Sequence, residues 1–177
     1  MGWAVILLPD ARAHDAAERV WRSVYNAGFR SMLFEGDNRP HLSLTVLDTQ
    51  DGTLPDAVRR FALGCRPVTV TFAGIGAFAE DVIYLSPEPA AELYAMNRAL
   101  AQALGPLLAL ADNHYMPGQW RPHMTVAFKI PDGDFNRVRK IVRENFTPFR
   151  ATFGEVAVVK FNPVKIVETI PFSSTPG

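Results

Sequence analysis

The chain has 177 residues, 48% of them apolar, which is enough for one domain with a sizeable core or for two small fused lobes. Its 18 basic residues balance 18 acidic ones, and this neutrality argues against a protein that coats nucleic acid, while a local basic pocket for one phosphate group remains compatible with it. Cys65 is the only cysteine, so an internal disulfide is excluded, and a reducing compartment, the cytoplasm, is expected.

Strands and helices alternate along the chain without a long apolar segment. The apolar run at residues 2–8 is too short to cross a bilayer, so it predicts a buried strand and no membrane partner. In chain order, the further predicted elements are a helix ending near Gly28, a strand over 40–47, a helix over 55–64, strands over 68–72 and 82–85, a helix over 93–108, a strand over 121–130, a helix over 135–146, strands over 148–161 and 164–171, and a frayed tail over 173–177.

Two segments of this order repeat. Residues 39–47 read Arg-Pro-His-Leu-Ser-Leu-Thr-Val-Leu, and residues 121–129 read Arg-Pro-His-Met-Thr-Val-Ala-Phe-Lys. After each come a helix, a proline and a strand with Thr-Phe, at 71–72 and 152–153. The offset is 82 residues at the histidines (41 to 123) and 81 at the Thr-Phe pairs (71 to 152). Chance resemblance would not preserve this order, so we infer a duplication of units at about 39–86 and 121–171.

The duplication predicts an α+β fold with two pseudo-symmetric lobes. Each lobe is expected to hold an antiparallel sheet with helices on its outer face, and the lobes are expected to flank a central cleft. Because a strand has a period of two, His41 and Ser43 share one strand face, as do His123 and Thr125. The opposite faces are apolar, at Leu42, Leu44 and Val46 and at Met124, Val126 and Phe128. We therefore expect both His/hydroxyl faces to meet across the cleft.

One histidine and one hydroxyl on each wall suit chemistry at phosphorus. Displacement at phosphorus needs a base on the attacking oxygen and an acid on the leaving oxygen, roughly in line. Two imidazoles that titrate near neutral pH can supply both, and the hydroxyls of Ser43 and Thr125 can donate to the non-bridging oxygens. The alternative is a pair of structural histidines repeated by duplication, but duplication alone need not keep a polar face opposite the core.

Residues beside the motifs extend this hypothesis. Arg39 and Arg121 each lie two residues before a histidine and could donate to phosphate, although solvent exposure or pairing with carboxylates is the alternative and is favoured for Arg39. Trp120 and Tyr115 could stack on a base, with ordinary core or rim packing as their alternative. No metal site is predicted, because Cys clusters, His-Glu-x-x-His and a local carboxylate ligand set are missing. His14 and His114, which lack a hydroxyl two residues on, are expected on the surface or in loops.

The motifs His41-Leu42-Ser43-Leu44 and His123-Met124-Thr125-Val126 resemble those of the two-histidine (2H) phosphoesterase superfamily. That group includes the RNA 2′,3′-cyclic phosphodiesterases, also called 2′–5′ RNA ligases. The resemblance extends from Trp3 to Phe172 and implies a bilobal fold and catalysis without a metal or other cofactor. It also implies that His41 protonates the leaving oxygen and His123 activates the nucleophile, roles that the pseudo-symmetry would also allow to be exchanged. The chain departs from many members at Ser43, where they carry threonine.

We therefore expect a single bilobal phosphoesterase domain over residues 1–177. Its expected activity is hydrolysis of a cyclic or diester phosphate on a nucleotide or short RNA end, since neutrality disfavours long RNA. The alternatives are a non-catalytic module that binds a nucleotide or RNA end, and a 2′–5′ RNA ligase that runs the reverse reaction. The intact motifs speak against the first. No Gly-x-x-x-x-Gly-Lys-Ser/Thr loop is present for an ATP-dependent ligase of that design. No obligate protein partner is indicated, and a monomer is expected.

Overall fold

One antiparallel sheet with helices on its outer faces forms the protein. In a computed structural model, the residues described, 2–29, 36–49, 52–161 and 163–173, contain seven strands and four α-helices. These are β1 Gly2–Pro9, α1 Ala11–Asn26, β2 Leu42–Asp48, α2 Leu54–Leu63, β3 Val68–Phe78, β4 Val82–Pro87, α3 Ala91–Leu104, β5 Met124–Phe128, α4 Phe135–Asn145, β6 Phe149–Lys160 and β7 Lys165–Pro171. The predicted α+β class and the order of elements are confirmed. Most of the predicted tail, at 174–177, lies outside the described residues.

The two predicted lobes are the two halves of one continuous sheet. Its strand order is β2-β1-β6-β3-β4-β5, and β7 also pairs with β6. The repeats fold as β2–α2–β3 and β5–α4–β6, and β3 pairs with β6 so that Val70 lies opposite Ala151. These residues are themselves equivalent, since 151 − 70 = 81 matches the offset between the Thr-Phe pairs. The pseudo-twofold axis therefore passes through the centre of the β3–β6 pair.

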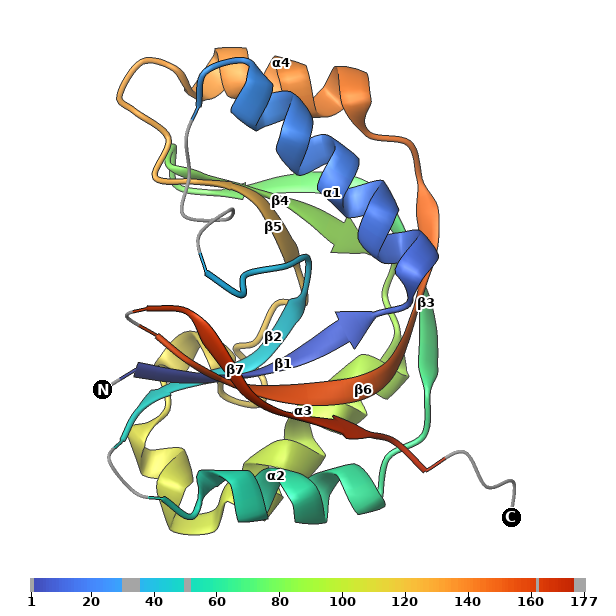
Figure 1. Ribbon diagram of the computed structural model, residues 1–177, viewed down its shortest axis with the longest axis vertical. Coiled ribbons are helices and arrows are strands. Elements are labelled where there is room, and N and C mark those ends of the chain that lie inside the picture. Colours follow the sequence, from blue (N-terminus) through green and yellow to red (C-terminus); the bar gives the residue numbers. More distant parts are fainter. Residues whose placement is uncertain (1, 30–35, 50–51, 162, 174–177) are drawn as a thin grey trace.

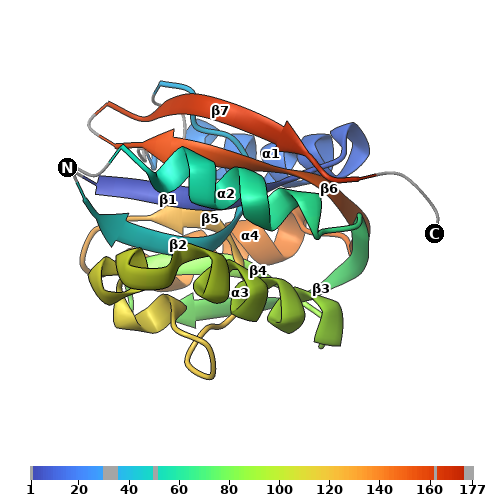
Figure 2. The ribbon, with the colours of Figure 1, turned by 90° about the horizontal axis from the view of Figure 1, so that it is seen from below.

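Each half carries its own pair of helices. Figure 1 shows α1 and α4 together over one half and α2 and α3 together over the other. Figure 2 shows α2 and α3 side by side from below, with β2, β1 and β6 behind them. The main core lies beneath these helices, and a smaller apolar cluster covers the opposite face of β1 and β6. Because β1 is buried on both faces, its sequence is apolar throughout rather than alternating.

Local chemistry sets several element ends. The Asp10 carboxylate caps α1 by accepting from the Ala13 N–H (3.0 Å) and also accepts from the Thr152 N–H (2.7 Å), which ties the helix start to β6. Gly105, at a φ of 55°, ends α3 before the predicted position 108, and a 3₁₀ helix follows over Gly105–Leu110. Lys129, at a φ of 56°, follows the end of β5, which is shorter than predicted. Within the described residues, none of the helices combines the length and the apolar composition that a membrane span requires.

Candidate active site

The two motif strands are the outermost strands of the sheet order, yet they contact each other. Because the sheet curls, β2 and β5 approach across the open side of the molecule (Figure 1). Each has a strand neighbour on one side only, β1 for β2 and β4 for β5. The motifs are thus brought together from opposite ends of the sheet, as the duplication predicts.

A β-bulge interrupts each motif strand at the same position. Between β1 and β2, Val5 pairs with Thr45 and Ile6 with Ser43, which leaves Leu44 as the extra residue. Between β4 and β5, the pairing likewise omits Val126, the equivalent residue (44 + 82 = 126). A bulge reverses the side-chain alternation beyond it.

Beyond the bulges, side chains lie on the strand face opposite to the one that strict alternation predicts. Val46 packs against the smaller cluster on the opposite face of the sheet, and Phe128 lines the cleft, whereas both were expected in the main core. Conversely, Thr45 is 3% exposed and its hydroxyl has no hydrogen-bond partner among the described residues, and Ala127 is buried. Phe128 is thus a cleft residue that strict alternation assigns to the wrong face.

The two catalytic candidates are held in the same way. His41 Nδ1 lies 2.6 Å from the Arg39 carbonyl oxygen, and His123 Nδ1 lies 2.7 Å from that of Arg121. A carbonyl only accepts, so each Nδ1 carries a proton and donates it. In the neutral imidazole, Nε2 is then the basic nitrogen, and in the imidazolium it becomes an acid.

Desolvation lowers the pKa of both imidazoles. Desolvation lowers the pKa of His41 below 6.5, the hydrogen bond to Arg39 opposes this, and the positive charge of a protonated His123 lowers it further. Desolvation also lowers the pKa of His123, against the hydrogen bond to Arg121. This influence of His123 on the pKa of His41 puts the two rings within electrostatic reach of each other.

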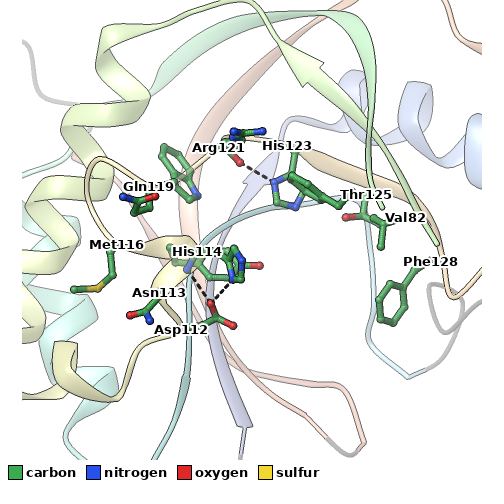
Figure 3. A pocket seen from close by; sticks show the side chains of 13 residues that line it. Val82, Asp112, Asn113, His114, Met116, Gln119, Arg121, His123, Thr125 and Phe128 are labelled. Atoms are coloured by element: carbon green, nitrogen blue, oxygen red, sulfur yellow. Dashed lines mark hydrogen bonds and ion pairs between the residues drawn. The ribbon is translucent and has the colours of Figure 1, made fainter. Parts of the chain in front are cut away.

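A cleft of about 1060 Å³ opens beside His123. In Figure 3, Val82, Thr125 and Phe128 lie on one side of this cleft, and Met116 and Gln119 lie on the other. Its lining residues are Phe78, Val82, Asp112, Asn113, His114, Tyr115, Met116, Gln119, Trp120, Arg121, His123, Thr125 and Phe128. His41, Ser43 and Arg39 are not among them, so of the two motifs only the second lines the cleft within the described residues.

Comparison with known families and structures follows from this geometry. A family model described as the 2′-5′ RNA ligase superfamily matches residues 9–164. The chain belongs to this superfamily. The fold is shared with TT0787 of Thermus thermophilus (17% identity, TM-score 0.67, covering 97% of this chain and 98% of that one). It is shared with LigT of Escherichia coli in complex with 3′-AMP (13% identity, TM-score 0.61, covering 97% of each chain). No curated protein sequence matches significantly.

Aromatic rings surround His123 in this member of the superfamily. Phe78 meets the imidazole edge to face at 4.9 Å between ring centroids, and Tyr84 lies at 5.2 Å. Phe78 and Tyr84 also pack on each other at 4.5 Å. A Cβ on Gly76 would collide with the Tyr84 ring, so this glycine gives the ring its place. The rings restrict the orientation of His123 and supply part of the desolvation that lowers its pKa.

Two of the four predicted phosphate ligands line the cleft, and two do not. Thr125 is half-buried and Arg121 is exposed, and both line the cleft. Ser43 is half-buried and hydrogen-bonds Tyr115 through its side chain, while Arg39 is exposed outside the cleft lining. Arg121 is thus placed to meet a ligand in the cleft, and Arg39 has the solvent exposure that the sequence favours.

The two predicted stacking residues both form hydrogen bonds with Ser43. Trp120 is 4% exposed, and its indole N–H donates to the Ser43 carbonyl at 2.9 Å. Burial raises the pKa of the Tyr115 phenol, the Asp112 carboxylate raises it further, and the hydrogen bond with Ser43 opposes them. Both residues touch the cleft, but their contacts fit the packing alternative better than stacking on a base.

Sequence reasoning named His114, Tyr115 and Trp120 but missed that they belong to one segment lining the cleft, residues 111–120, which we call the connector. It leads from the 3₁₀ helix after α3 into the second motif and supplies most of the cleft lining. The Asp112 N–H donates to the Val46 carbonyl (2.8 Å), and Ala111 bridges to Leu47, so the connector covers the open edge of β2. No periodicity marks it, and its partners on β2 lie more than 60 residues away.

His114, expected on the surface, is exposed at the cleft as part of this connector. Its Nδ1 lies 2.8 Å from the Asp112 carboxylate, and the same carboxylate oxygen accepts from its backbone N–H (Figure 3). These bonds, together with the charge of His114, lower the pKa of Asp112. Within the described residues, the group of side chains close enough to share a metal ion is elsewhere, at His14, Asp15 and Glu18 on α1, and none of them lines the cleft.

Proposed function

We propose that this chain hydrolyses a cyclic or diester phosphate on a nucleotide or short RNA end by acid–base catalysis between His41 and His123. The observation that carries the proposal is the matched pair of imidazoles. Each donates Nδ1–H to the carbonyl two residues earlier, which leaves Nε2 for proton transfer. Membership of the 2′-5′ RNA ligase superfamily and a phosphoesterase of the same fold (12% identity, TM-score 0.59) support the reaction class.

The reaction needs one imidazole neutral and the other protonated. The neutral Nε2 accepts a proton from water as the water oxygen bonds to phosphorus. The bond from phosphorus to the leaving ribose oxygen breaks, and that oxygen takes the proton from the second Nε2–H. A cyclic phosphate thus becomes a monoester, and the two histidines exchange protonation states. His123 is assigned as the base and His41 as the acid.

The hydroxyls and one arginine complete the proposed phosphate site. Ser43 and Thr125 follow the two histidines at the same spacing, so each can donate to a non-bridging oxygen. Arg121 lines the cleft and is exposed, which suits a charged donor to an anionic ligand, and Arg39 is a weaker candidate for that role. Donors aimed at the phosphate stabilise the charge that develops in the transition state.

We assign the nucleoside to the apolar side of the cleft. Phe78, Val82 and Phe128 line that side, and Phe78 and Phe128 replace Trp120 and Tyr115 as the candidates for contact with a base. LigT has been crystallised with 3′-AMP, ATP and NADP⁺, and this likeness of fold supports a nucleotide as the ligand here.

The test is hydrolysis of 2′,3′-cyclic nucleotides with EDTA present. We expect turnover by the wild type and a loss of about 10²–10⁴-fold in kcat for His41→Ala and for His123→Ala. His14→Ala is the matched control, because His14 lies on α1 away from the cleft and should keep full activity. Equal activity in all three variants would refute the two-histidine mechanism.

Two alternatives use the same cleft. A non-catalytic module would bind the cyclic nucleotide without turnover, and nothing in the intact motifs favours it. A 2′–5′ RNA ligase would join a 5′-hydroxyl end to the cyclic phosphate. Incubating two short RNAs with these ends separates the outcomes, since joined product indicates ligation and a free monoester indicates hydrolysis.

A further inference from the structure

Three tryptophans donate their indole N–H to backbone carbonyls. Trp21 donates to Thr125 at 2.9 Å, and Trp120 donates to Ser43 at 2.9 Å. Trp3 donates to Thr49 at 3.0 Å, beyond the end of β2. The first two acceptors are the hydroxyl residues of the two motifs and are equivalent positions, since 43 + 82 = 125.

The two motif acceptors lie beside the bulges. Ser43 immediately precedes the bulged Leu44, and Thr125 precedes the bulged Val126. A bulge leaves the strand ladder locally disrupted, so carbonyls next to it need partners from outside the ladder. Both indoles are nearly inaccessible to water, with Trp21 3% and Trp120 4% exposed, so water cannot readily replace the donors if they are lost.

We propose that Trp21 and Trp120 are positioning residues for the two motifs, each fixing a bulged edge strand through the carbonyl of the motif's hydroxyl residue. The proposal rests on the proposed function of the same site. His41 and His123 each lie two residues before the held carbonyl, so a shift of that carbonyl changes the direction of both the imidazole and the hydroxyl. Proton transfer in line with the phosphorus depends on these directions.

The two tryptophans differ in how many of the two motifs their hydrogen bonds connect. Trp21 belongs to α1, and its indole N–H donates to a carbonyl of β5. Trp120 lies three residues before His123 and holds Ser43, two residues after His41, so its bond links the two motifs directly. Asn97 also joins β2 to the connector, because its side-chain amide donates to the carbonyls of Leu44 (3.1 Å) and Tyr115 (2.9 Å). Loss of the Trp120 N–H should therefore disturb both histidines, and loss of the Trp21 N–H should disturb mainly His123.

Phenylalanine substitutions test the proposal, since they keep an aromatic ring and remove the N–H. With a 2′,3′-cyclic nucleotide as substrate, we expect kcat to fall by about 10- to 100-fold in Trp21→Phe and in Trp120→Phe, with a smaller change in KM. Trp3→Phe is the matched control, because it loses the same kind of bond outside the motifs and should keep its kcat. If Trp21→Phe and Trp120→Phe both keep a kcat as high as that of Trp3→Phe, the positioning role is wrong.

A second readout does not depend on turnover. The ¹⁵N shifts and titration of the imidazole nitrogens report the environment and tautomer of each histidine. We expect Trp120→Phe to change the signals of His41 and His123, Trp21→Phe to change those of His123, and Trp3→Phe to change neither. Unchanged signals in all variants would overturn the proposal. Changed signals without any turnover by the wild type would support it while refuting the proposed hydrolysis.

Should a phenylalanine variant fail to fold, β-(3-benzothienyl)alanine at the same position keeps the shape of tryptophan and removes only the N–H. We expect it to fold and to show the same losses. A folded analogue protein with wild-type kcat and wild-type imidazole signals would contradict the proposal.

Discussion

The depressed pKa values of His41 and His123 set the pH at which the pair can work. Both pKa values lie below 6.5, so the two rings are neutral together at neutral pH, and the reactive state with one proton grows as pH falls. Further acidification protonates both rings and abolishes the base. We expect kcat/KM, which reports the free enzyme, to follow a bell whose maximum lies below pH 6.5.

Measurement of kcat/KM for a 2′,3′-cyclic nucleotide across the acidic and neutral range checks this expectation. His14→Ala should reproduce the wild-type profile, since His14 is remote from the cleft. A maximum above pH 6.5 would show that the imidazoles of the free enzyme do not have the lowered pKa values that their burial imposes.

Gly76 offers a test of the ring cage around His123. In Gly76→Ala, the new Cβ meets the ring of Tyr84, which packs against His123 and Phe78. We expect a loss of about 1–3 kcal/mol in the free energy of unfolding, together with reduced kcat, because the displaced ring releases the imidazole. Urea unfolding and turnover measure the two effects.

The control for this substitution is Gly154→Ala in β6, where a Cβ would have no atom within 4 Å. It should change stability little and leave kcat unaltered. If Gly76→Ala behaves like Gly154→Ala, then Tyr84 moves freely and does not constrain His123.

At the scale of elements, local pattern predicts the strands but not their irregularities. The alternation over 40–47 and 121–130 predicts both motif histidines on the cleft side, and among the described residues His123 lines the cleft whereas His41 does not. It fails beyond Leu44 and Val126, because a bulge depends on pairing with β1 and β4, which are far away in sequence. Phe128 therefore could not be assigned to the cleft from its own neighbours.

The role of the connector could not be predicted from the sequence for a related reason. Its residues satisfy the edge of β2 through single hydrogen bonds to distant carbonyls rather than through a periodic apolar face. Trp120 and Tyr115 were predicted as stacking residues because aromatic rings beside a motif are typical of base contacts. In the fold, both line the cleft and both hydrogen-bond Ser43, which fits the packing alternative that the sequence also offers.

Among the described residues, one ion pair joins the edge strand β7 to helix α2. Arg59 of α2 donates from Nε and Nη2 to the two carboxylate oxygens of Glu168 in β7, both at 2.8 Å. The pair is exposed and should contribute little to global stability. Its geometry nevertheless restrains a strand that pairs with β6 alone among the described strands.

We therefore expect Arg59→Gln to raise amide hydrogen-exchange rates in β7 several-fold without a change in the urea midpoint. Arg60→Gln is the matched control, because Arg60 lies next to Arg59 and has no ion pair among the described residues. Equal exchange in the two variants would show that pairing with β6 is sufficient to hold β7.

At the scale of the whole molecule, the duplication explains both the symmetry and its limits. The repeat predicts two related halves from residue order alone. It could not predict that β3 and β6 join them into one sheet, because that pairing links Val70 to a residue 81 positions away. The halves are equivalent at the histidines, bulges and indole bonds, but the connector lies on one side only. A symmetric frame thus carries an asymmetric cleft.

The balance of charge over the whole molecule predicts how binding responds to salt and to RNA length. Arg121 lines the cleft and Arg39 lies near His41, so one or two phosphates should be neutralised, which corresponds to a slope of log K against log salt of about −1 to −2. We expect similar affinities of the inactive His123→Ala protein for a cyclic mononucleotide and for a longer RNA with the same cyclic end. Titration of both ligands at several salt concentrations measures the slope. Affinity that rises with RNA length, on a steeper slope, would contradict a short-end substrate and would direct attention to Arg139, Lys140 and Arg143, three of the four exposed cations of α4. Neutralising those three by glutamine would then remove the added affinity, whereas in a protein that binds only the end of its substrate the same changes leave binding as it was.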